Sequence, residues 1–76
     1  MNKQRREQIA KIAEAISELS SELETLRDEE QEYLDNMPES LQSSEKAQAA
    51  ESAVSNLDDA INGLEEVTSP LEEAQA

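Results

Sequence analysis

Carboxylates are the most abundant group in this sequence that could bind a metal or catalyse a reaction. The 76 residues contain 19 Asp and Glu side chains but no histidine and no cysteine. The densest acidic cluster consists of Asp28, Glu29, Glu30, Glu32 and Asp35. Clustered carboxylates can hold Ca²⁺ or Mg²⁺, and two carboxylates with separated pKa values can act as general acid and base.

Neither acidic stretch of the chain has the spacing of a metal site. Calcium loops hold their ligands on a tight turn, whereas nothing between Lys3 and Asp35 interrupts a helix, so the carboxylates of this cluster spread around it. Residues 58–63 resemble the start of an EF-hand loop. However, Ala60 stands at loop position 3 and Ser69 stands at position 12, where a bidentate glutamate belongs. The sequence therefore predicts no metal and no cofactor.

Catalysis is also not expected. Ser20, Ser21, Ser43 and Ser44 have no histidine to activate them, and helix caps and helix surfaces account for them. Paired carboxylates need a pocket that separates their pKa values, and a chain of this size has little material to build one. We expect a protein that is not an enzyme and has no catalytic residues.

The elements that position these side chains follow from a seven-residue repeat of apolar residues. An alternating spacing of three and four residues predicts a helix over about residues 3–36 with one narrow apolar seam, and only Glu30 interrupts it. The same spacing predicts a second helix over about residues 44–67. The apolar residues expected to form an oligomer interface are Ile9, Ile12, Ile16, Leu19, Leu23, Leu26, Val54, Leu57, Ile61 and Leu64.

A structured corner over residues 37–43 is expected to join the two helices. Pro38 disfavours a helical Met37 and ends the first helix at about Asn36. Asn36 and Glu39 have the spacing of a cap that opens a single turn, and Ser43 or Ser44 can cap the second helix. We expect Met37 and Leu41 to be tucked under this corner.

The second helix is expected to fray at Gly63, and a short helical turn is expected to follow it. Ser69, Pro70 and Glu72 have the pattern of a cap, a first-turn proline and a capping-box glutamate, which predicts a short turn over residues 69–74.

The predicted fold is all-α: a single domain over residues 1–76, built as a two-helix antiparallel hairpin that oligomerises into a helical bundle. A 76-residue chain without disulfides or metals buries little apolar surface alone, so self-association is expected. The basic start of the first helix and its acidic far end both oppose the helix dipole. Antiparallel packing would bring these opposite charges together, which favours a homodimer or tetramer.

The net charge of −13 limits the other partners. It repels nucleic-acid phosphates and anionic membranes, so we expect no direct nucleic-acid binding. No run of about 20 apolar residues is present to span a membrane, and the expected location is the cytoplasm.

Dense negative charge on a rod could also imitate DNA and occupy a cationic groove of another protein. The carboxylates of the first helix that could do so are Glu7, Glu14, Glu18, Glu22, Glu29 and Glu32. Many soluble coiled coils carry similar charge for solubility alone, so this remains an alternative hypothesis.

The corner is the least generic segment and the best candidate for partner binding. A simple hairpin link could be shorter, although a capped turn with two apolar plugs also accounts for it. The candidate partner-binding residues are Tyr33, Asn36, Met37, Pro38, Glu39, Ser40, Leu41 and Gln42.

The basic start, residues 28–33, the corner at 35–42, Ser44-Glu45 and the Ala/Glu/Leu-rich second helix together resemble a known group. The sequence is similar to small acidic helical-hairpin proteins encoded by phages, prophages and mobile elements of bacteria. The resemblance assigns no catalytic residues. It implies a protein that inhibits or sequesters a host component, including anti-defence inhibitors, with a host protein or small signalling molecule as partner. The alternative is a purely structural or assembly coiled coil.

Overall fold

The computed structural model describes residues 1–76 and contains only helices and their connections. Helix α1 spans Lys3–Asp35 and helix α2 spans Glu45–Glu66. A 3₁₀ turn, η1, spans Glu39–Leu41 between them, and a short helix, α3, spans Thr68–Ala74. The prediction of an all-helical fold is confirmed.

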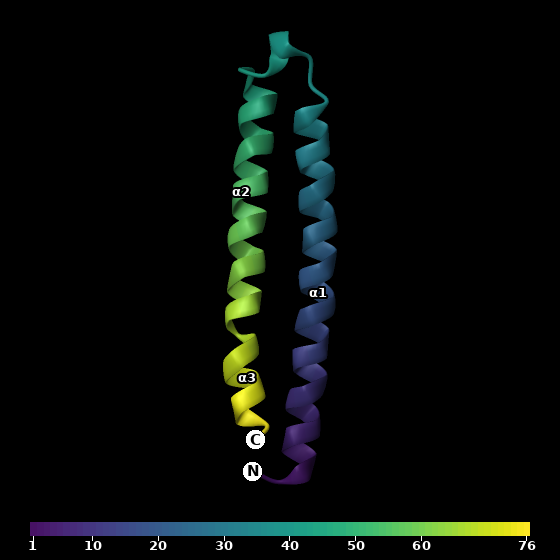
Figure 1. The fold of residues 1–76 in the computed structure, drawn as a ribbon, viewed down its shortest axis with the longest axis vertical. Helices are drawn as coiled ribbons and strands as arrows, with labels where there is room; N and C mark the ends of the chain where they lie inside the picture. The colour runs from purple at the N-terminus through teal and green to yellow at the C-terminus, as the bar shows by residue number, and fades with distance from the viewer.

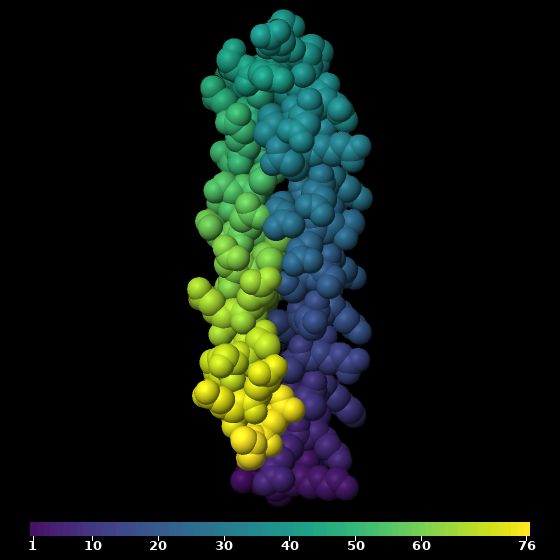
Figure 2. All heavy atoms as spheres, viewed as in Figure 1, coloured from purple at the N-terminus to yellow at the C-terminus, as the bar shows by residue number.

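The two long helices form a rod. They lie side by side, run in opposite directions and are joined at one end by the corner (Figure 1), and the two halves of the chain are in contact along the rod (Figure 2). The Cα atoms extend over 60 × 14 × 12 Å, with a radius of gyration of 17.4 Å. A compact chain of this length has a radius of gyration of about 11 Å, so the fold is strongly elongated.

Helix α1 has a capped start and a well-defined end. The Asn2 side chain accepts a 2.8 Å hydrogen bond from the Arg5 backbone N–H. At the other end, the Asn36 N–H donates to the Glu32 carbonyl at 2.9 Å. Asn36 is therefore the C-cap of α1, and the expectation that it caps the following turn is wrong. Its φ and ψ of −87° and 0° lie in the helical region, whereas an N-cap residue is extended.

Helix α2 starts at the second of the two serines proposed as caps. Ser44 is extended, with φ −74° and ψ 166°, and its Oγ accepts a 3.3 Å hydrogen bond from the Ala47 N–H. This geometry is that of an N-cap.

Helix α3 begins at Thr68, without a capping Ser69. Val67 precedes it in a helical conformation and no side chain caps it. Pro70 has no N–H to donate to the carbonyl of Glu66, which interrupts the helical ladder. Leu71 restores the ladder by donating to the Val67 carbonyl at 3.2 Å, so α3 continues along the line of α2 (Figure 1).

The core between α1 and α2 is thin. Ala47, Ala50 and Ile61 are the three buried residues, and no large side chain is fully buried. The half-buried residues of the helices that complete this seam include Ile9, Ala13, Ile16, Ser20, Leu23, Leu34, Val54, Leu57 and Leu64. Alanines and Ser20 allow the helices to approach closely, but they bury little apolar area.

Two sequence features have specific surroundings in the rod. Glu30 is half-buried in the seam and belongs to neither ion pair of the structure. Gly63 lies inside α2, and a Cβ atom added there would have nothing within 4 Å. The glycine therefore serves no close helix contact.

None of the helices contains an apolar stretch of the length and purity needed to cross a membrane.

Candidate functional site

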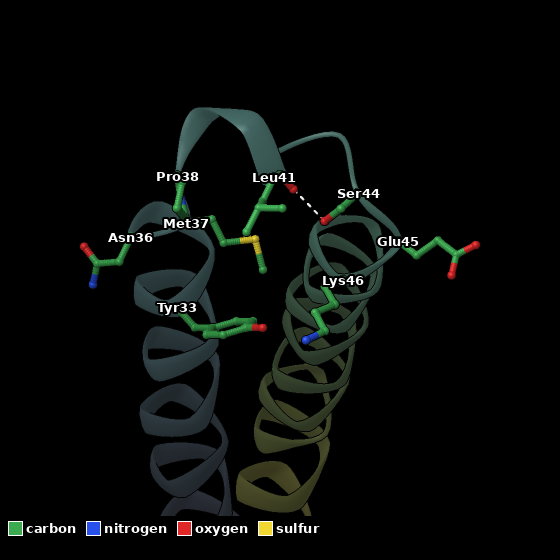
Figure 3. Close-up of a pocket in the computed structure, with 8 residues that line it drawn as sticks. All are labelled: Tyr33, Asn36, Met37, Pro38, Leu41, Ser44, Glu45 and Lys46. Carbon is green, nitrogen blue, oxygen red and sulfur yellow. Dashed lines mark hydrogen bonds between the residues drawn. The ribbon is translucent and has the colours of Figure 1, made fainter.

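The corner forms an open hollow, the corner pocket, at the tip where α1 turns into α2. Its volume is about 690 Å³, which falls within the roughly 300–1,000 Å³ typical of ligand sites. The residues that line it are Tyr33, Asn36, Met37, Pro38, Leu41, Ser44, Glu45 and Lys46 (Figure 3).

Local hydrogen bonds hold the corner in shape. The Leu41 N–H donates to the Pro38 carbonyl at 2.8 Å, which closes the 3₁₀ turn. The Leu41 carbonyl in turn accepts from both the backbone N–H and the Oγ of Ser44 (Figure 3). Ser44 thus ties the turn to the first residues of α2, so the pocket walls are fixed by the same residue that caps α2.

The corner pocket has an apolar interior and a charged edge. Tyr33 extends from α1 toward α2 beneath Met37 and Leu41, and Lys46 reaches the same region from α2 (Figure 3). Glu45 points away from the hollow, so its carboxylate stands at the outside edge (Figure 3). The arrangement can receive an apolar group and place a cation next to it.

Part of this pocket was predicted from the sequence. Among the candidate partner-binding residues, Tyr33, Asn36, Met37, Pro38 and Leu41 line it. Met37 is half-buried as expected, and Leu41 points into the hollow beside it but stays 49% exposed (Figure 3).

The remaining three candidates lie elsewhere in the corner. Glu39 and Ser40 belong to η1 and Gln42 follows it; none of them lines the pocket. The sequence prediction also missed Ser44, Glu45 and Lys46. The signal that could have found them is the cap at Ser44, because the first turn of an antiparallel helix must face the last turn of α1.

A second feature is an apolar row on α1. Ile12, Leu19, Leu26 and Tyr33 recur every seven residues and are 53%, 53%, 52% and 50% exposed. This nearly constant exposure means that the row keeps one position relative to α2 along its whole length. The other large apolar residues of α1, Ile9, Ile16, Leu23 and Leu34, are half-buried.

Helix α2 adds small apolar residues on the same side of the rod. Lys46 shares the corner pocket with Tyr33, which places both on one face. Ala53, Ala60 and Val67 follow Lys46 at the seven-residue interval and so stay on its side of α2. We call the surface formed by Ile12, Leu19, Leu26, Tyr33, Ala53, Ala60 and Val67 the apolar face.

The opposite side of the rod carries charged residues, and we call the surface formed by Arg27, Glu51, Asp58, Glu65 and Glu72 the acidic face. The two ion pairs of the rod meet there: Arg27 Nη1 lies 2.8 Å from Asp58 Oδ1, and Arg27 Nη2 lies 3.2 Å from Asp28 Oδ1. The hydrogen bonds from Asp58 and then Asp28 raise the pKa of the Arg27 guanidinium. The acids of α2 and α3 that recur with Asp58 at the seven-residue interval are Glu51, Glu65 and Glu72.

The predicted interface residues divide between these surfaces. Ile12, Leu19 and Leu26 lie on the apolar face, and Val54, Leu57, Ile61 and Leu64 are half-buried or buried in the seam. No group of three or more acidic side chains converges in a way that could hold a metal ion. Comparison with protein-family models, curated proteins and solved structures gives no match to this chain.

Proposed function

We propose that this chain is a non-enzymatic, oligomeric binding protein of the phage type, which inhibits or sequesters a component of its host cell by stoichiometric binding. The observation that supports partner binding best is the corner pocket. It combines a hollow of ligand size with exposed apolar side chains on a segment that is more elaborate than a simple helical connection requires.

The chemistry of the pocket favours a protein partner that inserts an apolar side chain. Tyr33 offers a large, rigid surface, and the flexible thioether of Met37 can adapt to different shapes. A buried apolar anchor of this kind supplies much of the energy in protein interfaces. Lys46 at the edge would select a partner with an acidic group beside that anchor.

Self-assembly is the second part of the proposal, and the apolar face supports it. Large apolar side chains that are half exposed along a continuous row are a common mark of an interface. The same face also favours a second candidate function, a purely structural or assembly coiled coil whose sole partner is itself or another protein of the same element.

DNA mimicry has less support. The six carboxylates of α1 that could imitate phosphates, Glu7, Glu14, Glu18, Glu22, Glu29 and Glu32, extend over about 38 Å of helix, which is one charge per roughly 8 Å. The acids of the acidic face recur every seven residues, or about 10 Å, and one of them, Asp58, is engaged by Arg27. Duplex DNA carries one charge per roughly 1.7 Å of axis, so both sets are much more dilute.

Pull-down from a bacterial host lysate with two variants tests the proposal. Leu41→Glu places a charge in the pocket, and Gln48→Glu adds the same charge at an exposed site of α2 outside it. We expect one host protein to be retained by the wild type and by Gln48→Glu but lost with Leu41→Glu. That protein, once purified, should bind at a fixed stoichiometry and lose its activity.

Three results would contradict the proposal. These are a wild type that retains no host protein, variants that retain the same proteins equally, and a pure chain that turns over a substrate. Loss of every host partner with retained self-association would favour the structural alternative.

A further inference from the structure

We propose that the apolar face packs on the same face of a second copy of this chain, with the two α1 helices antiparallel and the two corners at opposite ends. The inference rests on the self-assembly part of the proposed function, and it names the face, the direction and the register. Three observations support it: the excess surface of the rod, the unpaired basic start, and the symmetry of the apolar row.

The surface of the rod is larger than a chain of this mass needs to expose. Its accessible area is 5690 Å², whereas a compact monomer of 8.4 kDa exposes roughly 4,600 Å². The excess is comparable to the roughly 800 Å² that each partner buries in an ordinary stable interface. A second copy packed on the apolar face would bury this excess surface area and add apolar contacts to the thin core between α1 and α2.

Most charges of the rod form no ion pair within it, and those of the basic start are among them. Both ion pairs use Arg27, and the cations of the basic start, Lys3, Arg5, Arg6 and Lys11, form none. Antiparallel α1 helices would place Lys11 near Glu32 of the second copy, and Arg5 near its Glu39. Packing with both corners at the same end would set the acidic ends of the two α1 helices beside each other.

The apolar row determines how the two α1 helices align, because in an antiparallel pair the row of one copy must pack on the same row of the other copy running in the opposite direction. The axis of two-fold symmetry passes midway between Leu19 and Leu26, so Leu19 of one copy meets Leu26 of the other. Ile12 then meets Tyr33 of the second copy at each end of the row. An interface of this kind uses the same patch on both subunits and closes after two copies.

The same axis gives a consistent arrangement on α2. Arg27 and Asp58 form an ion pair, so they lie at about the same height along the rod. This pair shows which residues of α2 lie beside given residues of α1. In this register, Ala60 of one copy lies near Val67 of the other. Small alanine side chains let the two α2 helices approach closely, and the result is a four-helix bundle.

One consequence concerns the corner pocket. The start of α1 of the second copy lies beside the corner, so Met1 and Arg5 of that copy flank the pocket. Arg5 would add a second cation to Lys46 at its edge. The pocket is therefore complete only in the dimer, and its preference for an acidic partner is strengthened by the second copy.

Chemical crosslinking of single-cysteine variants tests the register, because the chain has no cysteine of its own. Glu22 lies beside the apolar row at the proposed axis, so Glu22→Cys of one copy faces Glu22→Cys of the other. Ser21→Cys is the matched control: it has the same height but lies near the acidic face, beside Leu64 and Glu65. Both positions are exposed, and circular dichroism verifies that both variants fold.

With a short bismaleimide crosslinker, Glu22→Cys should form covalent dimers at least about tenfold faster than Ser21→Cys, because its thiols are held together. Equal rates, or no dimer with either variant, would overturn the proposal. Sedimentation of the uncrosslinked chain separates the two levels of failure. A dimer mass without the Glu22→Cys product rejects the register alone, whereas a monomer mass rejects self-assembly itself.

Discussion

Arg27 and Asp58 connect the C-terminal half of α1 to the middle of α2 through a 2.8 Å hydrogen-bonded ion pair between Nη1 and Oδ1. The side chains are separated by 31 residues in the chain, so the pair fixes the lateral position of one helix against the other. Arg27 follows Ser20 and Ala13 at the seven-residue interval. The pair thus belongs to the side of α1 that faces α2 and leaves the row of Ile12, Leu19, Leu26 and Tyr33 outside.

Removing either charge of this pair should lower stability slightly, because Arg27 and Asp58 remain 30% and 46% exposed and solvent screens them. A double-mutant cycle with Arg27→Gln and Asp58→Asn isolates the interaction. We expect the double variant to lose less than the sum of the two single losses in thermal unfolding, and the coupling to shrink at high salt. Strictly additive losses would mean that the pair does not join the helices.

The seam should depend strongly on Ile61, which is 3% exposed. Ile61→Ala is expected to cost about 2–5 kcal/mol of unfolding free energy, and Ile61→Val about 0.5–1.5 kcal/mol. Urea denaturation followed by circular dichroism measures both. An Ile61→Ala variant as stable as the wild type would show that α1 and α2 do not pack through this residue.

Gly63→Ala should stabilise the chain by about 1 kcal/mol, because glycine is unfavourable inside a helix and the added methyl group meets nothing. Ser55→Ala, at an exposed position of the same helix, controls for a general effect of alanine. Urea denaturation of both variants checks the expectation. Destabilisation by Gly63→Ala would indicate a close contact at that position, for instance in the assembly.

Acidification should not unfold the protein. The hydrogen bonds to Asp58 and then Asp28 raise the pKa of Arg27. The stability that the charged guanidinium contributes is therefore complete at pH values below the ordinary pKa of arginine. It is lost only as the pH rises through the raised pKa. Lowering the pH toward about 4.5 therefore leaves Arg27 charged, while the net charge of −13 shrinks as the pH approaches the sequence pI of about 4.1. Helicity measured by circular dichroism should hold or increase. Abrupt helix loss at mild acidity would instead mean that ion pairs with carboxylates dominate stability.

Much of the fold could be predicted from the sequence because its signals are local. The seven-residue repeat and Pro38 are read directly from the chain, and they indicate two helices and a corner. Ser69 illustrates the limit of local patterns. It has the sequence signature of a cap, but the helical conformation of Val67 and the missing N–H of Pro70 decide where α3 begins.

The division of the apolar residues between seam and outer face could not be predicted in this way. The sequence places Ile12 and Ile16 in one continuous seam, whereas the structure turns Ile12 outward and keeps Ile16 half-buried. That choice depends on which side of α1 approaches α2. It is set by non-local features, the small Ala13 and Ser20 and the pairing of Arg27 with Asp58, and single-chain periodicity does not report them.

The apolar face makes a direct prediction for charge insertion. Leu26→Glu should convert the proposed dimer into a monomer, because two carboxylates would be buried near the centre of its interface. Thr25→Glu places the same charge on the adjacent exposed position of α1 and should leave the dimer intact. Size-exclusion chromatography with light scattering distinguishes the two masses. Equal behaviour of both variants would exclude the apolar face as the interface.

Sedimentation equilibrium of the wild-type chain at micromolar concentration tests the central claim most directly. The apolar face, uncovered in the single rod, predicts a folded species with twice the chain mass of 8.4 kDa. A well-folded, helical species at the single-chain mass under the same conditions would contradict self-assembly through this face.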